Sequence, residues 1–248
     1  MMKKIPMLLA VAATLAACSN TGDEGPRVQA SGQQGQRSFQ LADFDSVSLR
    51  GPDDVEVRVG PAFAITAQGD TGVMQALEIK REGNELLIGR RGRGNNFSWG
   101  DSDNDGGAIR IIVTMPAIRA ASLAGSGDLR VDRVAGGDFN ASLAGSGDLA
   151  LAQVQANALS MNVAGSGDLS AAGTAGRVDV SIAGSGNVDG GSLGTRAAKI
   201  AIAGSGNARL QVDGDADVSI VGSGDVDLGP KARCQASKMG SGEVRCGG

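Results

Sequence analysis

The chain has 248 residues, with 23 Lys and Arg against 27 Asp and Glu, so its formal net charge is −4. This acidic balance argues against a nucleic-acid-binding protein. The sequence has no His, which removes the commonest general base and metal ligand, and only five Phe and one Trp, too few to expect an aromatic platform for sugars or bases.

Residues 1–18 are predicted to be an export signal. Lys3 and Lys4 form a positively charged start, and an apolar stretch follows over residues 5–15. This stretch is too short to cross a bilayer as a stable helix and is typical of a signal peptide. We therefore expect the chain to leave the cytoplasm.

The segment Leu15-Ala16-Ala17-Cys18 resembles the lipobox of bacterial lipoproteins. The resemblance implies cleavage before Cys18 and acylation of this cysteine, and two or three acyl chains hold a protein firmly at a membrane. Lipoproteins without Asp after the cysteine go on to the outer membrane, and here Ser19 follows. The expected product is an outer-membrane lipoprotein that faces the periplasm or the cell surface. The alternative is an ordinary signal peptide cleaved near Ala17.

Residues 19–37 are predicted to be a flexible tether. Gly, Ser, Gln, Asn and Asp are frequent there and apolar side chains are nearly absent, so the segment cannot bury enough surface to fold. The folded part is expected to begin at residue 38 and is long enough for one sizeable core.

Residues 38–118 are expected to form β-structure without a regular repeat. Alternating or β-branched residues predict strands at Val47–Leu49, Val55–Val59, Leu86–Ile88 and Ile109–Val113. The simplest arrangement is a set of less regular coils that cap the repeats that follow. A small, separate antiparallel domain is the alternative.

A polar loop between two of these strands contains three carboxylates, Asp101, Asp103 and Asp105, followed by Gly106. This spacing matches the first half of an EF-hand calcium loop, but Ile112 stands where the motif needs a bidentate Glu. Opportunistic calcium binding is one interpretation, and a solvated loop is the other. Because the loop also carries Trp99, it is the first place where we expect a partner to bind.

The tripeptide Gly-Ser-Gly occurs seven times at intervals of 18 to 20 residues in the second half of the chain. A fixed period of this length is the signature of a solenoid, in which each repeat forms one coil. The copies begin at Gly125, Gly145, Gly165, Gly184, Gly204, Gly222 and Gly240.

Aligned on the tripeptide, residues 119–248 show a column of Leu, Val or Ile two positions before the first Gly and a column of Leu, Val or Ala two positions after the second. Between these positions the residues are polar or small, which predicts strands with one buried face. Each coil is therefore expected to be strand, sharp corner, strand and a looser second corner near Gly173, Gly190 or Gly214. The predicted fold is an all-β, right-handed parallel β-solenoid of about seven coils.

The glycines of the tripeptide are predicted to form the sharp corner, because a turn within three residues needs positive φ or close backbone approach. A phosphate-binding loop is the other use of Gly-x-Gly. No copy continues to a third Gly or to Gly-Lys-Ser/Thr, so the structural interpretation is preferred.

A column of acidic and amide residues follows the corner and is expected to form a ladder along one edge of the rod. One interpretation is side chains that cap backbone N–H groups, and the other is a row of weak calcium sites. The column consists of Asp128, Asp148, Asp168, Asn187, Asn207, Asp225 and Glu243.

The seventh repeat differs from the others. Lys238 stands where earlier coils have Leu, Val or Ile, and Cys234 and Cys246 fall on inward positions on either side of the corner. In an oxidising compartment these cysteines are expected to form a disulfide that holds the last coil.

The sequence from about Phe39 to Cys246 resembles the bacterial head GIN-domain family of autotransporter adhesin-like proteins. The resemblance rests on Phe44–Leu49, Val55–Val57, Ile111–Pro116 and the repeated Leu/Ile-Ala-Gly-Ser-Gly-Asp/Asn. It implies a lipid-anchored or secreted β-helical protein of the cell envelope and brings no catalytic residues.

The expected function is a non-enzymatic envelope module that binds, spaces or adheres, without a cofactor and without nucleic acid. Calcium is the one ion considered, so a calcium-responsive module is an alternative. A polysaccharide-active enzyme is the other alternative, but the outward positions carry mainly Ser, Ala, Asn and Asp.

Overall fold

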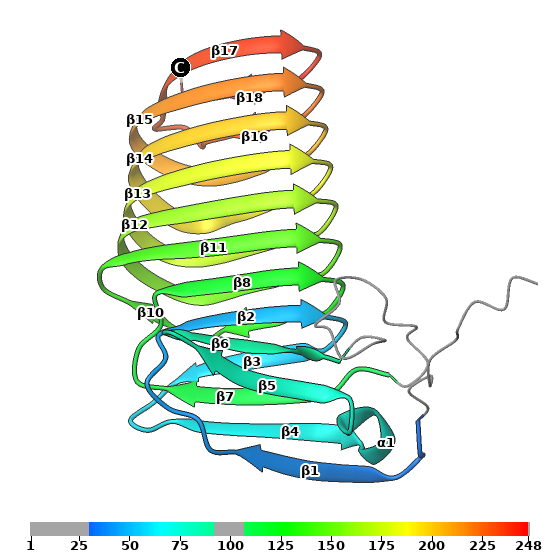
Figure 1. Cartoon of the computed structure of the whole chain (residues 1–248). Coiled ribbons are helices and arrows are strands. Elements are labelled where there is room, and N and C mark those ends of the chain that lie inside the picture. Colours follow the sequence, from blue (N-terminus) through cyan, green and yellow to red (C-terminus); the bar gives the residue numbers. More distant parts are fainter. Residues whose placement is uncertain (1–29, 92–106, 248) are drawn as a thin grey trace, which may run out of the picture.

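The computed structural model describes residues 30–91 and 107–247. In this part of the chain, eighteen strands join into one sheet that winds into a right-handed parallel β-solenoid (Figure 1), as the sequence predicts. The first strand lies at the base of the rod and the C-terminal coil at its top. No described helix is long and apolar enough to cross a membrane.

The upper part of the rod consists of the repeat region. Its seven corners stack one above another, and six turns of chain join them. The strands are β8 (Ala120–Gly125), β9 (Leu129–Val131), β10 (Val134–Ala135), β11 (Asp138–Gly145), β12 (Leu149–Gly165), β13 (Leu169–Gly184), β14 (Val188–Gly204), β15 (Ala208–Gly222), β16 (Val226–Asp227), β17 (Arg233–Gly240) and β18 (Val244–Arg245).

The predicted apolar columns form the core. Leu143 of β11 pairs with Leu123 below it and with Val163 above it, and all three side chains are buried. The residues between them on each strand point outward, so each coil buries one face of its strands against the interior. Parallel stacking in constant register follows from repeating the same inward positions in every coil.

Each sharp corner is built by its two glycines. The first adopts a positive φ in every copy, +129° at Gly145, and the carbonyl oxygen of Gly125 below it accepts bonds from Ser146 N and Gly147 N at 3.0 and 3.1 Å. At the second, the backbones of neighbouring coils pass so closely that a Cβ on Gly147 would overlap the carbonyl oxygen of Gly127. The structural interpretation of the tripeptide is thus confirmed.

The second corner differs from the sequence-based expectation. Strands β12 to β15 run through it without a break, and the strand stops there only in the first coil, near Gly136 and Gly137, and in the last, between Asp227 and Arg233. The pairing of neighbouring coils shifts register here, for example between Gly190 and Gly194 of β14. Because the sharp corners remain in register, the differences in coil length are absorbed at this second bend.

The N-terminal part closes the base of the rod. Its elements are β1 (Gln34–Phe39), β2 (Ser46–Gly51), β3 (Asp54–Val59), β4 (Ala64–Asp70), α1 (Thr71–Met74), β5 (Leu77–Glu82), β6 (Glu85–Arg90) and β7 (Arg110–Met115). β4 runs antiparallel to β1 and β7, and β5 runs antiparallel to β6. These antiparallel pairs end the parallel stack.

β1 starts inside the segment predicted as a tether, so residues 34–37 are strand. Its residues pair with β4 from Gln34 opposite Asp70 to Phe39 opposite Ile65. Its side chains are exposed or only partly buried, so the strand lacks the hydrophobic pattern from which it could have been recognised.

β2 and β3 form an additional coil directly below the repeats. β2 pairs with β8 in parallel, with Gly51 opposite Gly125, so Gly51-Pro52-Asp53 takes the place of a Gly-Ser-Gly corner. The side chain of Asp53 is fully buried and accepts bonds from Arg90 Nη2 at 2.6 Å and from Ile109 N at 2.9 Å. This buried ion pair ties the corner to β6 and to the residues preceding β7.

The last coil is fastened by the expected disulfide. Cys234 on β17 and Cys246 after β18 are bonded, with their Cα atoms 6.2 Å apart. Lys238 lies opposite Ile220, and its Nζ donates to the carbonyl oxygen of Gly242 at 3.1 Å. The charged side chain therefore bonds the final corner at the open end of the rod.

Candidate functional site

Part of the predicted sites lies outside the described residues. Cys18 belongs to residues 1–29, and Asp101, Asp103 and Asp105 belong to residues 92–106. Lipidation and calcium binding at these positions stay predictions.

The ladder beside the sharp corner is a chain of hydrogen bonds. Asn187 donates from both its backbone N and its Nδ2 to Asp168 Oδ1, at 3.1 and 2.8 Å. Asn207 bonds Asn187 Oδ1 in the same way, at 3.1 and 2.9 Å. From Asp148 upward, each side-chain oxygen accepts a bond from the backbone N–H of the next coil, as for Glu243 N on Asp225 at 2.8 Å.

These contacts favour backbone capping, with the capped N–H one coil away instead of in the same turn. Within residues 30–91 and 107–247, no three Cys, Asp or Glu side chains form a group that could hold a metal ion. The calcium interpretation of the ladder therefore has no structural support and stays a prediction.

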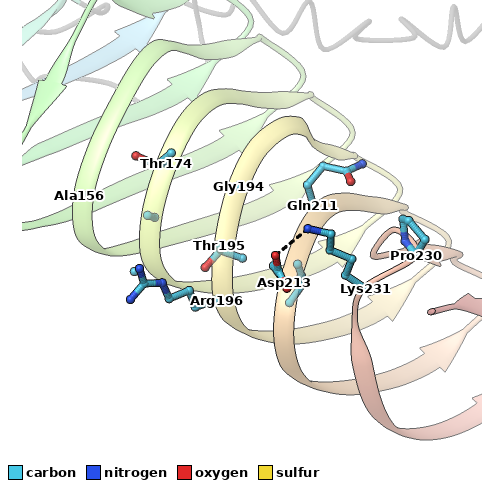
Figure 2. Close-up of a pocket in the computed structure, with 12 residues that line it drawn as sticks. Ala156, Thr174, Gly194, Thr195, Arg196, Gln211, Asp213, Pro230 and Lys231 are labelled. Carbon is cyan, nitrogen blue, oxygen red and sulfur yellow. Dashed lines mark hydrogen bonds and ion pairs between the residues drawn. The ribbon is translucent and has the colours of Figure 1, made fainter. Parts of the chain in front are cut away.

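A different feature, on the second bend, has the shape of a binding site. A groove of about 690 Å³ crosses the coils from β12 to the last coil (Figure 2). Small residues form much of its lining, and polar side chains project at its sides. The lining residues are Ala156, Thr174, Ala175, Gly176, Gly194, Thr195, Arg196, Gln211, Val212, Asp213, Pro230 and Lys231.

The groove exists because two columns of outward-facing residues, stacked from coil to coil, are each interrupted by a glycine. The two glycines lie in adjacent coils. Thr174 on β13 pairs with Gly194 on β14, which pairs in turn with Gln211 on β15, so a polar column is interrupted at Gly194. An added Cβ at Gly194 would have no neighbour nearer than 3.9 Å. The space between Thr174 and Gln211 is therefore open.

The second interruption is at Gly176. Because Ala175 pairs with Thr195 and Arg177 pairs with Ala197, Gly176 lies opposite Arg196. Above Arg196, a Cβ on Gly214 would overlap the carbonyl oxygen of Arg196, so that position also carries no side chain. Arg196 thus has no side chain directly below it, and the register shift sets Asp213 and Gly214 together opposite it in the coil above.

The groove carries two positive side chains and one negative side chain, and only one of the positive ones is paired with another described residue. Lys231 Nζ and Asp213 Oδ2 form an ion pair at 2.9 Å between neighbouring coils, drawn as a dashed line in Figure 2. The hydrogen bond from Lys231 lowers the pKa of Asp213 and raises that of Lys231. Arg196 is exposed and makes no hydrogen bond or ion pair with any residue that the structure describes. One guanidinium is therefore available to a ligand.

The sequence alone did not identify this site. Val212-Asp213-Gly214 is recognisable as part of the second bend, but nothing marks it as one wall of a groove. The missing signal is the register between coils, which sets Gly194 between Thr174 and Gln211. Register shifts at this bend make that pairing hard to infer from spacing.

The fold and the groove together define the class of protein. It is a right-handed parallel β-solenoid with a capped base and a groove on its side. The chain belongs to the family described as "Putative auto-transporter adhesin, head GIN domain", whose pattern matches residues 43–247. The resemblance inferred from the sequence motifs is thus confirmed.

Several solved structures share the fold. A "putative lipid binding protein" from Parabacteroides distasonis is 24% identical with a TM-score of 0.70, over 89% of this chain and 99% of the other. A "putative adhesin" from Bacteroides fragilis is 18% identical with a TM-score of 0.74, over 88% and 99%. A "putative adhesin" from Parabacteroides merdae is 15% identical with a TM-score of 0.68, over 89% and 98%.

At these identities the structural matches establish the fold alone. No curated protein matches the chain. Function has to be argued from the groove and from its place on the rod.

Proposed function

We propose that the protein is a non-catalytic binding module of the cell envelope, anchored through a lipid on Cys18 and displaying its groove away from the membrane. One observation carries the proposal: the first described strand lies at the base of the rod (Figure 1), whereas the residues that line the groove belong to the upper coils, from β12 to the last one. An anchor at the N-terminus then holds the base toward the membrane.

The start of the described chain is fastened to the base by Asp70. Its two carboxylate oxygens accept bonds from Ser31 N at 2.8 Å and Gly32 N at 2.7 Å. The same carboxylate caps α1 by accepting from Gly72 N at 2.8 Å. The backbone hydrogen bonds from Ser31, Val73 and Gly72 lower the pKa of Asp70 to about 2, so the carboxylate is ionised at neutral pH.

The rod between base and groove supports the display of a ligand site. Coils stack at roughly 4.8 Å, so the levels from β2 to β12, where the groove begins, span about 14 Å, and those from β2 to β17 about 34 Å. Backbone hydrogen bonds join neighbouring corners along the whole length of the repeats. A stack of this kind has no hinge about which the groove could swing relative to the base. The groove is thus held at a fixed distance from the first strands.

The chemistry of the groove supports binding without catalysis. Asp213 is the only carboxylate among the lining residues, and it forms an ion pair with Lys231. Hydrolysis of a glycosidic bond needs two carboxyl groups on either side of it. Membership of an adhesin-like family agrees with a binding role.

Metabolic labelling with radioactive palmitate tests the anchor. The wild type and a Cys234→Ser/Cys246→Ser variant should both incorporate label and fractionate with the outer membrane, while Cys18→Ser should do neither. The double variant shows whether the loss of cysteines other than Cys18 affects labelling. Label that persists in Cys18→Ser would contradict the proposed anchor.

Orientation is tested by treating intact cells with a membrane-impermeant amine reagent. Lys199 and Lys231 are exposed on the upper coils. Modification of both in intact cells places the rod on the surface, and modification only after the outer membrane is opened places it in the periplasm.

A further inference from the structure

We propose that the groove binds an acidic glycan, a linear polysaccharide with carboxylate groups, and that Arg196 binds one of these carboxylates. The inference rests on the proposed binding function and names the ligand class of the same groove. It does not depend on the lipid anchor, because the groove lies in the folded rod.

The groove has the dimensions of a site for an extended chain. Its lining comes from five successive levels, from Ala156 on β12 to Lys231 in the last coil, which is about 19 Å at the usual strand spacing. The two glycines that carry no side chain, Gly176 and Gly194, lie on adjacent levels, and the space around Gly194 is open. One sugar unit advances a polysaccharide by a length close to one coil, so successive units would lie against successive coils.

A peptide fits this groove less well than a glycan. Extended peptides are recognised chiefly by adding a strand to a free sheet edge. Here β13, β14 and β15 pair with one another along the rod, so their backbone groups are mostly occupied. What remains for a ligand is side chains: the hydroxyl of Thr174 and the amide of Gln211, which suit hydroxyl groups.

The charge of the groove points to an anionic ligand. Arg196 is exposed and makes no hydrogen bond or ion pair with the described residues, and neither Gly176 below it nor Gly214 above it places a side chain against its guanidinium. A guanidinium offers donors in a planar fork that matches a carboxylate. The neighbouring Lys231 is already paired with Asp213, so Arg196 is the group that is available to bind a carboxylate of the ligand.

The test is titration calorimetry on the detergent-purified full chain. The probes are a short oligogalacturonate, its methyl ester and polyglutamate. The methyl ester keeps the sugar rings and removes the charge, while polyglutamate keeps the carboxylates and removes the sugars. Oligogalacturonate should bind more tightly than either, and less tightly as salt increases.

Two variants locate the site. Arg196→Gln should weaken oligogalacturonate binding roughly tenfold or more, the usual scale of a charge-assisted hydrogen bond, and should leave the methyl ester nearly unaffected. Gly194→Gln should fill the groove and reduce binding of both sugars, since the backbone there has room for a side chain.

The controls lie on the same strand, β14. Lys199→Gln removes one exposed positive charge, and Ala203→Gln adds the same side chain to an exposed position outside the groove. Both should bind oligogalacturonate like the wild type, and circular dichroism checks that all four variants are folded.

Three results would overturn the proposal: no binding of oligogalacturonate, equal loss in Arg196→Gln and Lys199→Gln, or tighter binding of polyglutamate. None of them bears on palmitate labelling, so failure of the ligand assignment and failure of the anchor remain distinguishable.

Discussion

The two turns of each coil follow different rules. At the sharp corner, the same two positions are glycine in all seven repeats, because the backbones of neighbouring coils touch there. At the second bend, close approach occurs at a different position from coil to coil, such as Gly173 and Gly214, and elsewhere there is open space, as at Gly194. Backbone contact fixes the corner sequence, whereas the bend is free to vary and to form a site.

The largest difference between the two turns is expected when a single methyl group is added to a glycine of each. In Gly167→Ala, the added Cβ would overlap the carbonyl oxygen of Gly147 in the middle of the stack, and we expect a loss on the order of 4 kcal/mol or more, or failure to fold. Gly194→Ala at the bend should change the free energy of unfolding by less than about 0.5 kcal/mol. Urea denaturation followed by circular dichroism measures both, and similar losses would mean that the two turns do not differ.

The second test concerns the corner that lacks the tripeptide. Arg90→Leu leaves the carboxylate of Asp53, which has no exposed side-chain surface, without its counter-ion. Removing one partner of a buried pair typically costs about 3–5 kcal/mol. Urea denaturation should show this loss.

A double variant separates charge from packing at this corner. Adding Asp53→Asn to Arg90→Leu removes the buried charge and keeps an oxygen to accept from Ile109 N. It should recover at least half of the lost stability. No recovery would indicate that Arg90 acts through its packing and its bond to Gly107 O.

The contrast between these corners shows what the sequence could reveal. The columns through Leu123, Leu143 and Val163 and the repeated tripeptide specify the stack, because identical residues must occupy identical places in each coil. The β2–β3 coil continues the apolar columns, with Leu49 opposite Leu123, but its corner shares only the first glycine, Gly51. Its buried pair joins residues 37 positions apart. Such a contact has no local pattern.

The groove was inaccessible to sequence reasoning for a similar reason. Its residues come from five levels, and each is ordinary for an outward position. Only the pairing of Thr174, Gly194 and Gln211 shows that a side chain is missing between two polar ones.

The third test addresses the ladder beside the corner. Asn187→Ala removes the bond to Asp168 Oδ1 and the oxygen that accepts from Asn207. Because these residues are exposed or half-buried, we expect a loss of about 1 kcal/mol. Gln211→Ala, a matched change at the bend, should cost less than about 0.5 kcal/mol. A larger effect at Gln211 would assign it a structural role that its contacts do not indicate.

The smallest effect is expected at the ion pair between coils at the bend. Lys231 lowers the pKa of Asp213 below its usual 3.8, so the pair contributes stability above pH 3.8 and loses that contribution as the pH falls below it. Lys231→Gln should return the Asp213 pKa toward 3.8, which carbon-detected NMR titration of the carboxyl group can follow. Both side chains are about 70% exposed, so salt should reduce the difference between wild type and variant, and the melting temperature should barely change. A pKa that does not move in Lys231→Gln would mean that the pair does not persist in solution. In that case Asp213 would be free to meet a ligand, and its charge would oppose the acidic glycan that Arg196 is proposed to bind.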